Sequence, residues 1–303
     1  MTKSVFFLSD GEVVDTKTEL EKEQKQLESS TTKTFIESVR KDLLTNNIHL
    51  PTLPALALEA LIIINDADSS ASDLEKVISR DASLTARLIR YANSPLYRGM
   101  NTIASIRPAI TRIGFQRVKN AVYAVSMKEV FRTTVKDIEK RMDRLWTHSV
   151  KVGAQAAMLA KEQHGLDPDI ALVAGLVHDI GYIPLLIKAC DYKELIDKPE
   201  FLDKVLHKLH SQLGGSILKL WKFDQHVIDA AAHHEDLSRD PGDDEPVNYV
   251  DIVQVANIIA HEDSDHFLAS VDRSEIKAFS RLKHSDGKSP LNADTKQVED
   301  AVF

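Results

Sequence analysis

Apolar residues recur at helical spacing almost without interruption from Phe35 to His261, and this regularity constrains the fold more than any other feature of the chain. Residues three or four positions apart share one face of a helix, whereas a half-buried strand alternates at every second position. Such alternation is absent from this stretch, and the apolar residues are mostly Leu, Ile, Val and Ala. The sequence therefore predicts an all-α fold of helices packed on helices. The N-terminal VFFLSD is the single candidate for a short strand.

Breaks in this pattern divide the 303 residues into four parts. Residues 1–32 are polar and form an N-terminal extension, and residues 33–135 form a first helical group. Residues 136–272 form a second helical group. Residues 273–303 are a polar C-terminal tail, which we expect to be disordered because it offers little apolar surface to bury.

Composition limits the environment of the protein. The chain is 43% hydrophobic and 28% charged, as is typical of a globular protein. Cys190 is the single cysteine, which excludes an internal disulfide framework and is typical of a reducing cytoplasm. No uninterrupted apolar run approaches the roughly 20 residues that span a bilayer, and no signal peptide is apparent. We therefore expect a cytoplasmic protein with no membrane association.

His178 and Asp179 form the centre of the stretch GLVHDIGYIPLL, residues 175–186. An imidazole and a carboxylate from one turn of backbone suit a divalent metal such as Zn, Mn or Fe(II). The pair follows the apolar run ALVAGLV and precedes Gly181, so we expect it at the inner end of a buried helix. An unpaired carboxylate would be costly there, which favours a metal site or a polar network over a solvated pair.

Four further histidines, His148, His210, His233 and His234, also border apolar stripes. Considered singly, each is more simply a satisfied core or surface histidine. Clustered histidines and carboxylates inside a helical bundle are nevertheless typical of metal or hydrolytic sites. We predict that these four residues, with the His178–Asp179 pair, converge on one pocket between helices. The remaining histidines lack this placement and are interpreted as surface residues: His164, His207, His226, His261, His266 and His284.

The segment from Arg80 to Arg132 holds ten basic and two acidic residues, a net charge of +8 in a chain whose total is −8. Such a segment could bind anions or an acidic partner, although solvated or internally paired helix faces are the simpler interpretation. The candidate residues for an anion-binding or partner surface are Arg107, Arg112, Arg117 and Lys119. The acidic pI and the lack of a recognised DNA-binding motif make nucleic acid an unlikely partner.

The order of these motifs resembles the HD superfamily of metal-dependent phosphohydrolases, and the first half resembles its HDOD (HD-related output domain) branch. The resemblance covers about residues 45–262. It is carried by LPTLPALALEALIII, ISRDASLTARLIRYANSP and IASIRPAITRIGF, then by Trp146–His148, AGLVHDIG, HSQLGGSILKLWKF and the His233–His234 pair. It implies two packed helical lobes, the second of them an HD-like bundle, in a bacterial signalling protein.

The resemblance also implies roles for individual residues. It matches three metal ligands of HD enzymes with His148, His178 and Asp179, and the additional histidines of binuclear sites with His210, His233 and His234. Asn257 stands where a late Asp ligand is expected, and Tyr182 replaces a frequent Lys. An amide is a neutral and weaker ligand than a carboxylate. We therefore expect a degenerate site in which a divalent metal (Fe, Mn, Zn or Mg) is weakly held or absent.

The favoured interpretation is thus a signal-transduction output module that binds a protein partner or a small nucleotide-like ligand and is not an enzyme. The alternative is an active metal-dependent phosphohydrolase acting on a nucleotide or cyclic dinucleotide. In that case a metal would activate water and a histidine would serve as acid or base. Asn257 and Tyr182 both argue against the alternative.

Overall fold

The computed structural model describes residues 30–45, 55–242, 244–262, 264–282 and 293–302. All regular elements in these ranges are helices, and no strand occurs among them. The all-α prediction is confirmed. The VFFLSD segment lies outside the described residues.

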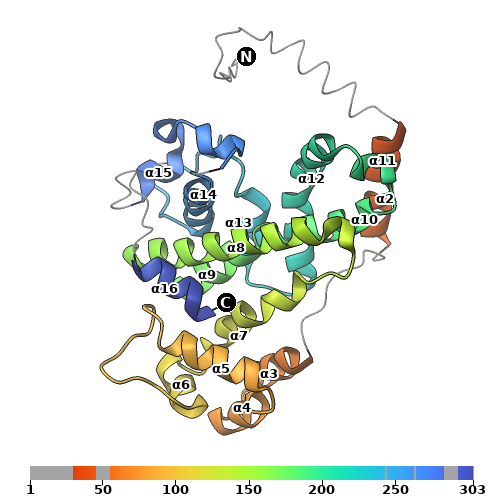
Figure 1. Cartoon of the computed structure of the whole chain (residues 1–303). Helices are drawn as coiled ribbons and strands as arrows, with labels where there is room; N and C mark the ends of the chain where they lie inside the picture. The colour runs from red at the N-terminus through yellow and green to blue at the C-terminus, as the bar shows by residue number, and fades with distance from the viewer. Residues whose placement is uncertain (1–29, 46–54, 243, 263, 283–292, 303) are drawn as a thin grey trace.

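Five helices form the N-terminal lobe, which lies at the bottom of Figure 1. Helix α3 packs on α4 and α7, while α5 packs on α6 and α7. In α5 the predicted apolar face is buried at Leu84, Leu88 and Tyr91, and the side chain of Asp81 caps the first turn. The bounds are α3 (Ala55–Asn65), α4 (Ala71–Ile78), α5 (Ala82–Ala92), α6 (Ile106–Ile113) and α7 (Val118–Val130).

The C-terminal lobe is built around α8 and α9, which pack along each other and against α14. Helix α13 packs on α9, α12 and α14, so three layers of helices cover the centre of this lobe. The bounds are α8 (Lys136–Glu162), α9 (Pro168–Val177), α10 (Tyr182–Ala189), α11 (Lys193–Ile196), α12 (Pro199–Leu220), α13 (Gln225–His233), α14 (Tyr249–Ala260), the 3-10 turns η1 (Phe267–Ser270) and η2 (Arg273–Glu275), α15 (Lys277–Arg281) and α16 (Ala293–Val302).

Helix α9 lies at the centre of the molecule. All of its ten residues except Pro168 and Ile170 are buried, and a helix that is apolar on every side is typical of a core position. The side chain of Asp167 accepts a hydrogen bond from the backbone N–H of Asp169, and proline fits the first turn because it lacks a donor. The His178–Asp179 pair follows the last turn, as predicted.

One segment of the described residues, Pro168–Ala189, is long and apolar enough to cross a membrane by length and composition alone. It contains His178, Asp179 and Lys188, so it is not an uninterrupted apolar run. The segment is divided into α9 and α10 by the residues around His178, and 83% of its most apolar window is buried inside the protein. Its apolar character therefore has a sufficient explanation in the core of the C-terminal lobe.

Two glycines allow the helices that carry the candidate ligands to approach closely. A Cβ on Gly175 of α9 would lie 2.8 Å from the Cα of Gly153 in α8. A Cβ on Gly181 would lie 2.0 Å from the carbonyl oxygen of His210 in α12. Side chains do not tolerate such contacts with backbone atoms, so both positions require glycine. The close contacts fix α8, α9 and α12 backbone to backbone beside His178 and His210.

Helix α2 (Ser30–Leu44) is placed differently from the predicted division, which assigned residues 33–135 to the N-terminal lobe. It packs on α10 and α11 of the C-terminal lobe. Phe35 is fully buried there, and its ring meets Tyr192 edge to face with centroids 5.4 Å apart. Sequence spacing alone could not show this, because residues 46–54 separate α2 from α3.

The C-terminal segment is not the disordered tail that its polar composition predicts, within its described residues. Helix α15 packs on α14, and α16 packs on both α5 and α8 (Figure 1). Val298 is fully buried, and Asp294 forms an ion pair with Arg98 at 3.1 Å. A few apolar side chains thus anchor a segment that is polar on average. Residues 283–292 lie outside the described ranges.

A buried carboxylate joins the two lobes at the start of α9. The hydroxyl groups of Tyr91 and Tyr97, both from the N-terminal lobe, donate hydrogen bonds to the carboxylate of Asp169. Asp169 is 2% exposed, and burial raises its pKa to about 6 despite the two donors. Arg117 and Asp167 form an ion pair at 3.4 Å in the same region.

This carboxylate predicts a pH-dependent stability difference between the wild type and Asp169→Asn. In the unfolded chain the group ionises near 3.8, whereas the folded chain keeps the proton up to about 6. The folded state therefore binds more protons between these values and loses stability as the pH rises through them. We expect the wild type to lose about 2.4 kcal/mol relative to Asp169→Asn between about pH 4 and pH 7. Urea unfolding of both proteins measures this, and parallel profiles would contradict it.

A second prediction concerns the contact at Gly181. We expect Gly181→Ala to destabilise the protein by about 3 kcal/mol or more, because the added methyl group meets a backbone oxygen that cannot rotate away. Gly214 faces the same contact from α12, but a Cβ there would have its nearest neighbour at 3.4 Å. Gly214→Ala is therefore the matched control and should change the free energy of unfolding by less than about 1 kcal/mol. Equal stability of the two variants in urea unfolding would exclude this explanation.

Candidate metal centre

Five of the six predicted residues form one buried cluster around Asp179. Its Oδ1 lies 3.3 Å from the Nε2 atoms of both His210 and His234. Its Oδ2 lies 3.3 Å from Nε2 of His178 and 3.9 Å from Nε2 of His148. His148 lies in α8 and His210 in α12, whereas His178 and Asp179 directly follow α9 and His234 directly follows α13. These five residues are called the histidine–aspartate cluster below.

His233 is exposed and lies outside this cluster. The buried stripe of α13 runs through Val227, Ala230 and Ala231 and continues at His234, three residues later. The preceding residue points about 100° away from that stripe. The predicted convergence of all six residues is therefore wrong for His233, because two adjacent helical residues cannot share one face.

Backbone carbonyl groups orient the histidines of the cluster. In His178, His210 and His234, Nδ1 lies 2.7–3.0 Å from the carbonyl oxygen three residues earlier. A carbonyl can only accept, so Nδ1 carries the proton and Nε2 presents a lone pair. These lone pairs surround Asp179, whose carboxylate also only accepts. Histidines that bind a metal through one ring nitrogen typically donate such a hydrogen bond from the other.

Several polar atoms of this region are buried without a hydrogen-bond partner: Nε2 of His148, Nε2 of His178, Oδ1 of Asp179 and Oδ1 of Asn257. An unsatisfied buried polar group costs about 1–3 kcal/mol. A divalent ion would satisfy these acceptors together, and the mixture of nitrogen and oxygen donors suits Zn, Fe or Mn. The residues therefore fit a divalent metal.

The spacing of the ligand atoms allows two neighbouring ions. One group consists of His148, His178 and Asp179, and another consists of Asp179, His210 and His234. Within each group the ligand atoms lie within 4.8 Å of one another. Asp179 belongs to both groups, so its two oxygens could serve two ions.

The pKa shifts of Asp179 and His148 favour their ligand forms, whereas that of His234 does not: burial would lower the pKa of His234, but the hydrogen bond to Asp179 outweighs it and raises that pKa. Burial alone would raise the pKa of Asp179, but His178 and the other imidazoles outweigh it and hold the pKa well below its ordinary value. Burial holds the pKa of His148 well below its ordinary value, and His178 adds to the effect. At neutral pH the carboxylate is therefore ionised and the His148 imidazole is neutral, as metal binding requires.

Asn257 lies on the buried face of α14 beside His148, where the resemblance placed it. Its amide oxygen could coordinate a metal but adds no negative charge. Tyr182 stacks on the His210 ring with centroids 4.2 Å apart and an angle of 25° between the planes. Burial raises the pKa of Tyr182 well above its ordinary value, so the phenol remains neutral. Tyr182 therefore fixes the orientation of the His210 ring.

Two histidines interpreted as surface residues instead stack beside the cluster. His261 lies against His148 with ring centroids 4.3 Å apart, and against His266 with centroids 3.9 Å apart. Burial lowers the pKa of His261 to about 4 and also lowers that of His266, so both rings are neutral near pH 7. The sequence held one signal for His261, which follows Asn257 by one helical turn. His266 comes from a loop and carried no such signal.

His207 and Glu235 were also missed, and they pair on the solvent side of the cluster. Nδ1 of His207 lies 3.1 Å from Oε2 of Glu235, which lies 3.4 Å from Nε2 of His210. The hydrogen bond to Glu235 raises the pKa of His207. The spacing of His207 and His210, three residues apart on α12, could have indicated a shared face. The interpretation as surface residues holds for His164 and His226, and His284 lies outside the described residues.

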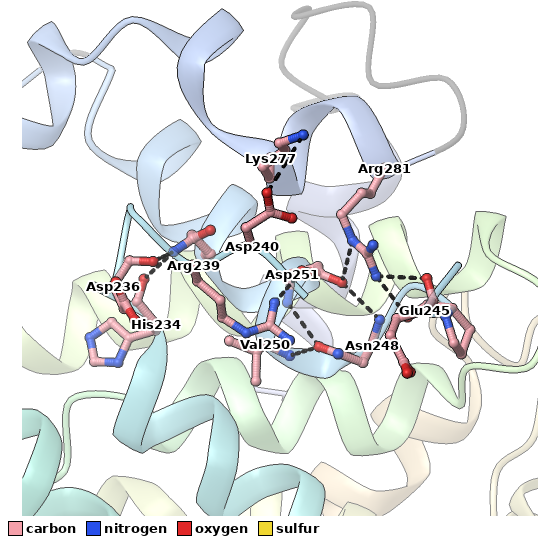
Figure 2. Close-up of polar contacts among 12 residues, drawn as sticks. His234, Asp236, Arg239, Asp240, Glu245, Asn248, Val250, Asp251, Lys277 and Arg281 are labelled. Carbon is pink, nitrogen blue, oxygen red and sulfur yellow. Dashed lines mark hydrogen bonds and ion pairs between the residues drawn. The ribbon is translucent and has the colours of Figure 1, made fainter. Parts of the chain in front are cut away.

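Helix α14 also holds the loop that carries the last histidine of the cluster. Gln254 donates a hydrogen bond to the carbonyl oxygen of Asp236 at 2.9 Å. Asp251 is 1% exposed and forms ion pairs with Arg239 at 2.6 Å and Arg281 at 3.2 Å (Figure 2). A buried carboxylate paired with two guanidinium groups resists rearrangement, because removing either partner leaves a charge uncompensated. These contacts fix three segments to one another: the loop that follows α13, helix α14 and helix α15.

The residues of the proposed basic surface have contacts within the chain. Arg107 and Arg117 each form an ion pair with an acidic residue, at 2.6 and 3.4 Å. Arg112 donates a hydrogen bond to the carbonyl oxygen of Asn101 at 2.6 Å. Lys119 is half-exposed. These contacts agree with internal pairing, and a role toward an anion or a partner stays a prediction.

The position of Asn257 gives a testable prediction. Asn257→Asp places a carboxylate near Asp179, and without metal the two like charges should destabilise the fold. With Mn²⁺ or Fe²⁺ the added ligand should recover the loss and raise metal affinity about tenfold or more. That gain is about 1.4 kcal/mol, or roughly 2–4 °C in melting temperature. Thermal melting of both proteins in chelator and in metal measures the difference. An equal response of the two proteins to metal would show that residue 257 is not at a ligand position.

Solved structures share the fold of this chain. A protein of Shewanella amazonensis SB2B, named by inference as a metal-dependent phosphohydrolase, is 26% identical with a TM-score of 0.78. That match covers 91% of this chain and 100% of the other. An HDOD domain protein of unknown function from Geobacter sulfurreducens is 22% identical with a TM-score of 0.59, over 88% of this chain and 96% of the other. The second likeness shows the fold alone.

Sequence comparison identifies the family. An uncharacterized protein of Treponema pallidum (strain Nichols) is 28% identical over 76% of this chain and 46% of its own length. Ribonuclease Y of Clostridium kluyveri is 34% identical over 36% of this chain and 18% of its own length. The chain thus spans less than half of the length of these curated relatives. The model of the HDOD domain matches residues 50–237, more than half of the chain. The chain therefore belongs to the HDOD domain family.

Proposed function

We propose that this protein is a bacterial signal-transduction output module that acts by binding, with a divalent metal held weakly in the histidine–aspartate cluster. Asn257 is the observation that carries the proposal. Its buried amide group lies beside His148, where a carboxylate would add a charged ligand. A metal centre with one neutral donor in place of an anionic one would bind its ion more weakly and would be less reactive toward a substrate. The ion would still stabilise the fold or serve a sensory role.

The side chains suit a structural use of the metal. His178, His210 and His234 are fully buried, and His148 and Asp179 are 16% and 11% exposed. The ion would join ligands from α8 and α12 to ligands at the C-terminal ends of α9 and α13, and would therefore stabilise the packing of these helices. A bound ion would also supply Lewis acidity toward a phosphoryl oxygen. Tyr182, neutral and stacked on His210, offers no cation to a phosphate.

The partner in this proposal is a protein or a small nucleotide-like ligand of the cytoplasm. The inter-lobe cluster of Tyr91, Tyr97 and Asp169 supports a role for lobe packing in signalling. Helix α9 begins at this cluster and ends at His178. A ligand that alters the packing of the lobes would therefore act on the same helix that positions the candidate metal ligands.

The second candidate function is a metal-dependent phosphohydrolase that acts on a nucleotide or cyclic dinucleotide. The likeness to the Shewanella protein, at 26% identity, favours it. So does the convergence of four histidines on Asp179. His207 and Glu235, on the solvent side, are the groups that could exchange a proton with a substrate in this case.

Metal content and hydrolysis, measured on the same preparations, separate the two functions. We expect the purified full-length wild type to retain Mn, Fe or Zn and His148→Ala to lose it, with His164→Ala as an exposed-histidine control. Hydrolysis of bis(p-nitrophenyl) phosphate and of a cyclic dinucleotide should be no faster with the wild type than with His148→Ala. Metal-dependent hydrolysis that His148→Ala abolishes would establish the second function instead. Metal absent from every preparation, including after incubation with Mn²⁺, would refute the proposed metal centre.

A further inference from the structure

His207, His210 and Glu235 form a third group of potential ligands on the solvent side of the histidine–aspartate cluster. Their ligand atoms all lie within 4.8 Å of one another. The side chain of His207 is 37% exposed and that of Glu235 is 14% exposed, whereas His210 is fully buried. These three residues are called the outer group. An ion from solvent would meet the outer group before it reached the fully buried histidines.

Two of the three ligand-atom distances within the outer group match tetrahedral coordination. Ligands at about 2.0–2.1 Å from a tetrahedral ion lie about 3.4 Å apart. Oε2 of Glu235 lies 3.1 Å from Nδ1 of His207 and 3.4 Å from Nε2 of His210. Two imidazoles and one carboxylate are also a ligand set that zinc uses when one coordination position stays open.

His266 is close to the outer group but does not complete it. Its ring lies 6.4 Å from the ring of His207. The backbone N–H of Leu268 donates a hydrogen bond to Nδ1 of His266 at 3.4 Å, so Nε2 of His266 carries the proton. His266 is also not among the residues whose ligand atoms lie within 4.8 Å of one another. An ion in the outer group would replace the proton that Nδ1 of His207 donates to Glu235. The fourth position of the outer group is therefore open to solvent or to an anionic ligand.

His210 belongs to both the outer group and the cluster, and its ring limits how many ions the two can hold. Its Nδ1 donates to the carbonyl oxygen of His207 at 2.8 Å, which leaves Nε2 as the single lone pair of the ring. The same Nε2 lies 3.3 Å from both Asp179 and His234. His210 can therefore bind an outer ion or an ion shared with Asp179 and His234, but not both at once.

We propose that His207, His210 and Glu235 form a divalent metal site of zinc type with one open position, which excludes an ion from the Asp179–His210–His234 position. The proposal rests on the proposed function only through the shared ligand His210. It places the second ion outside the buried cluster and leaves the ion of His148, His178 and Asp179 unaffected. Its open position would bind solvent or a small anion such as phosphate.

Zinc titration of chelator-treated full-length protein tests the site by calorimetry and native mass spectrometry. We expect two ions in the wild type. His207→Phe and Glu235→Gln should each weaken one ion about tenfold or more and leave the other unchanged. His234→Phe should retain both ions, because the outer group does not use that ring. His226→Phe is the control, an exposed histidine replaced by the same residue, and should match the wild type.

Other patterns overturn this proposal. If His207→Phe and Glu235→Gln bind two ions as tightly as the wild type, or if His234→Phe loses the second ion, the outer site does not exist. A single ion that depends on His148 alone refutes the outer site and leaves the proposed function standing. A single ion that depends on His207 and Glu235 but not on His148 supports the outer site and refutes the proposed metal centre. Circular dichroism melting confirms folding, and Glu235→Gln decides the test if His207→Phe does not fold.

Discussion

The organisation of the C-terminal lobe depends on one buried carboxylate. Asp179 lies among four imidazoles directly after the buried helix α9, and a charge in that position must be compensated. Compensation requires side chains from α8, from α12 and from the end of α13 to reach one point. The close backbone approach at Gly153, Gly175 and Gly181 makes this geometrically feasible. Compensation of the Asp179 charge and close packing of the helices therefore depend on each other, and neither alone explains the arrangement of this lobe.

Helical periodicity was sufficient to predict the fold class, and it placed His178, His210 and His234 correctly because each continues a buried stripe. The same argument failed for His233. That residue directly precedes the buried His234 but is itself exposed, because it lies outside the buried stripe of α13. The argument also failed for His266, whose position depends on a loop that brings distant residues together. Periodicity describes one helix at a time, so it cannot show which faces of different helices meet.

Average composition misled at the C-terminal segment, where a few residues decide the outcome, whereas the internal pairing of the basic segment was the simpler interpretation. The polar C-terminal segment is anchored by side chains such as Val298, and its Arg281 pairs with a buried carboxylate. The basic segment has a large formal charge, but Arg107 and Arg117 meet acidic partners from elsewhere in the chain. Long-range pairs of this kind leave no trace in local sequence, because both members look like ordinary surface residues until the chain folds.

The clamp formed by Arg239, Asp251 and Arg281 has a consequence for where the domain ends. The family match ends at residue 237, yet α14 covers the cluster and α15 secures α14 through that clamp. Asn257 and Gln254 lie beyond the matched region as well. The matched segment is thus shorter than the set of helices that encloses the cluster. An isolated fragment that ended at residue 237 would lack α14 and present its imidazoles to bulk water, so it would not reproduce the buried environment of the intact chain.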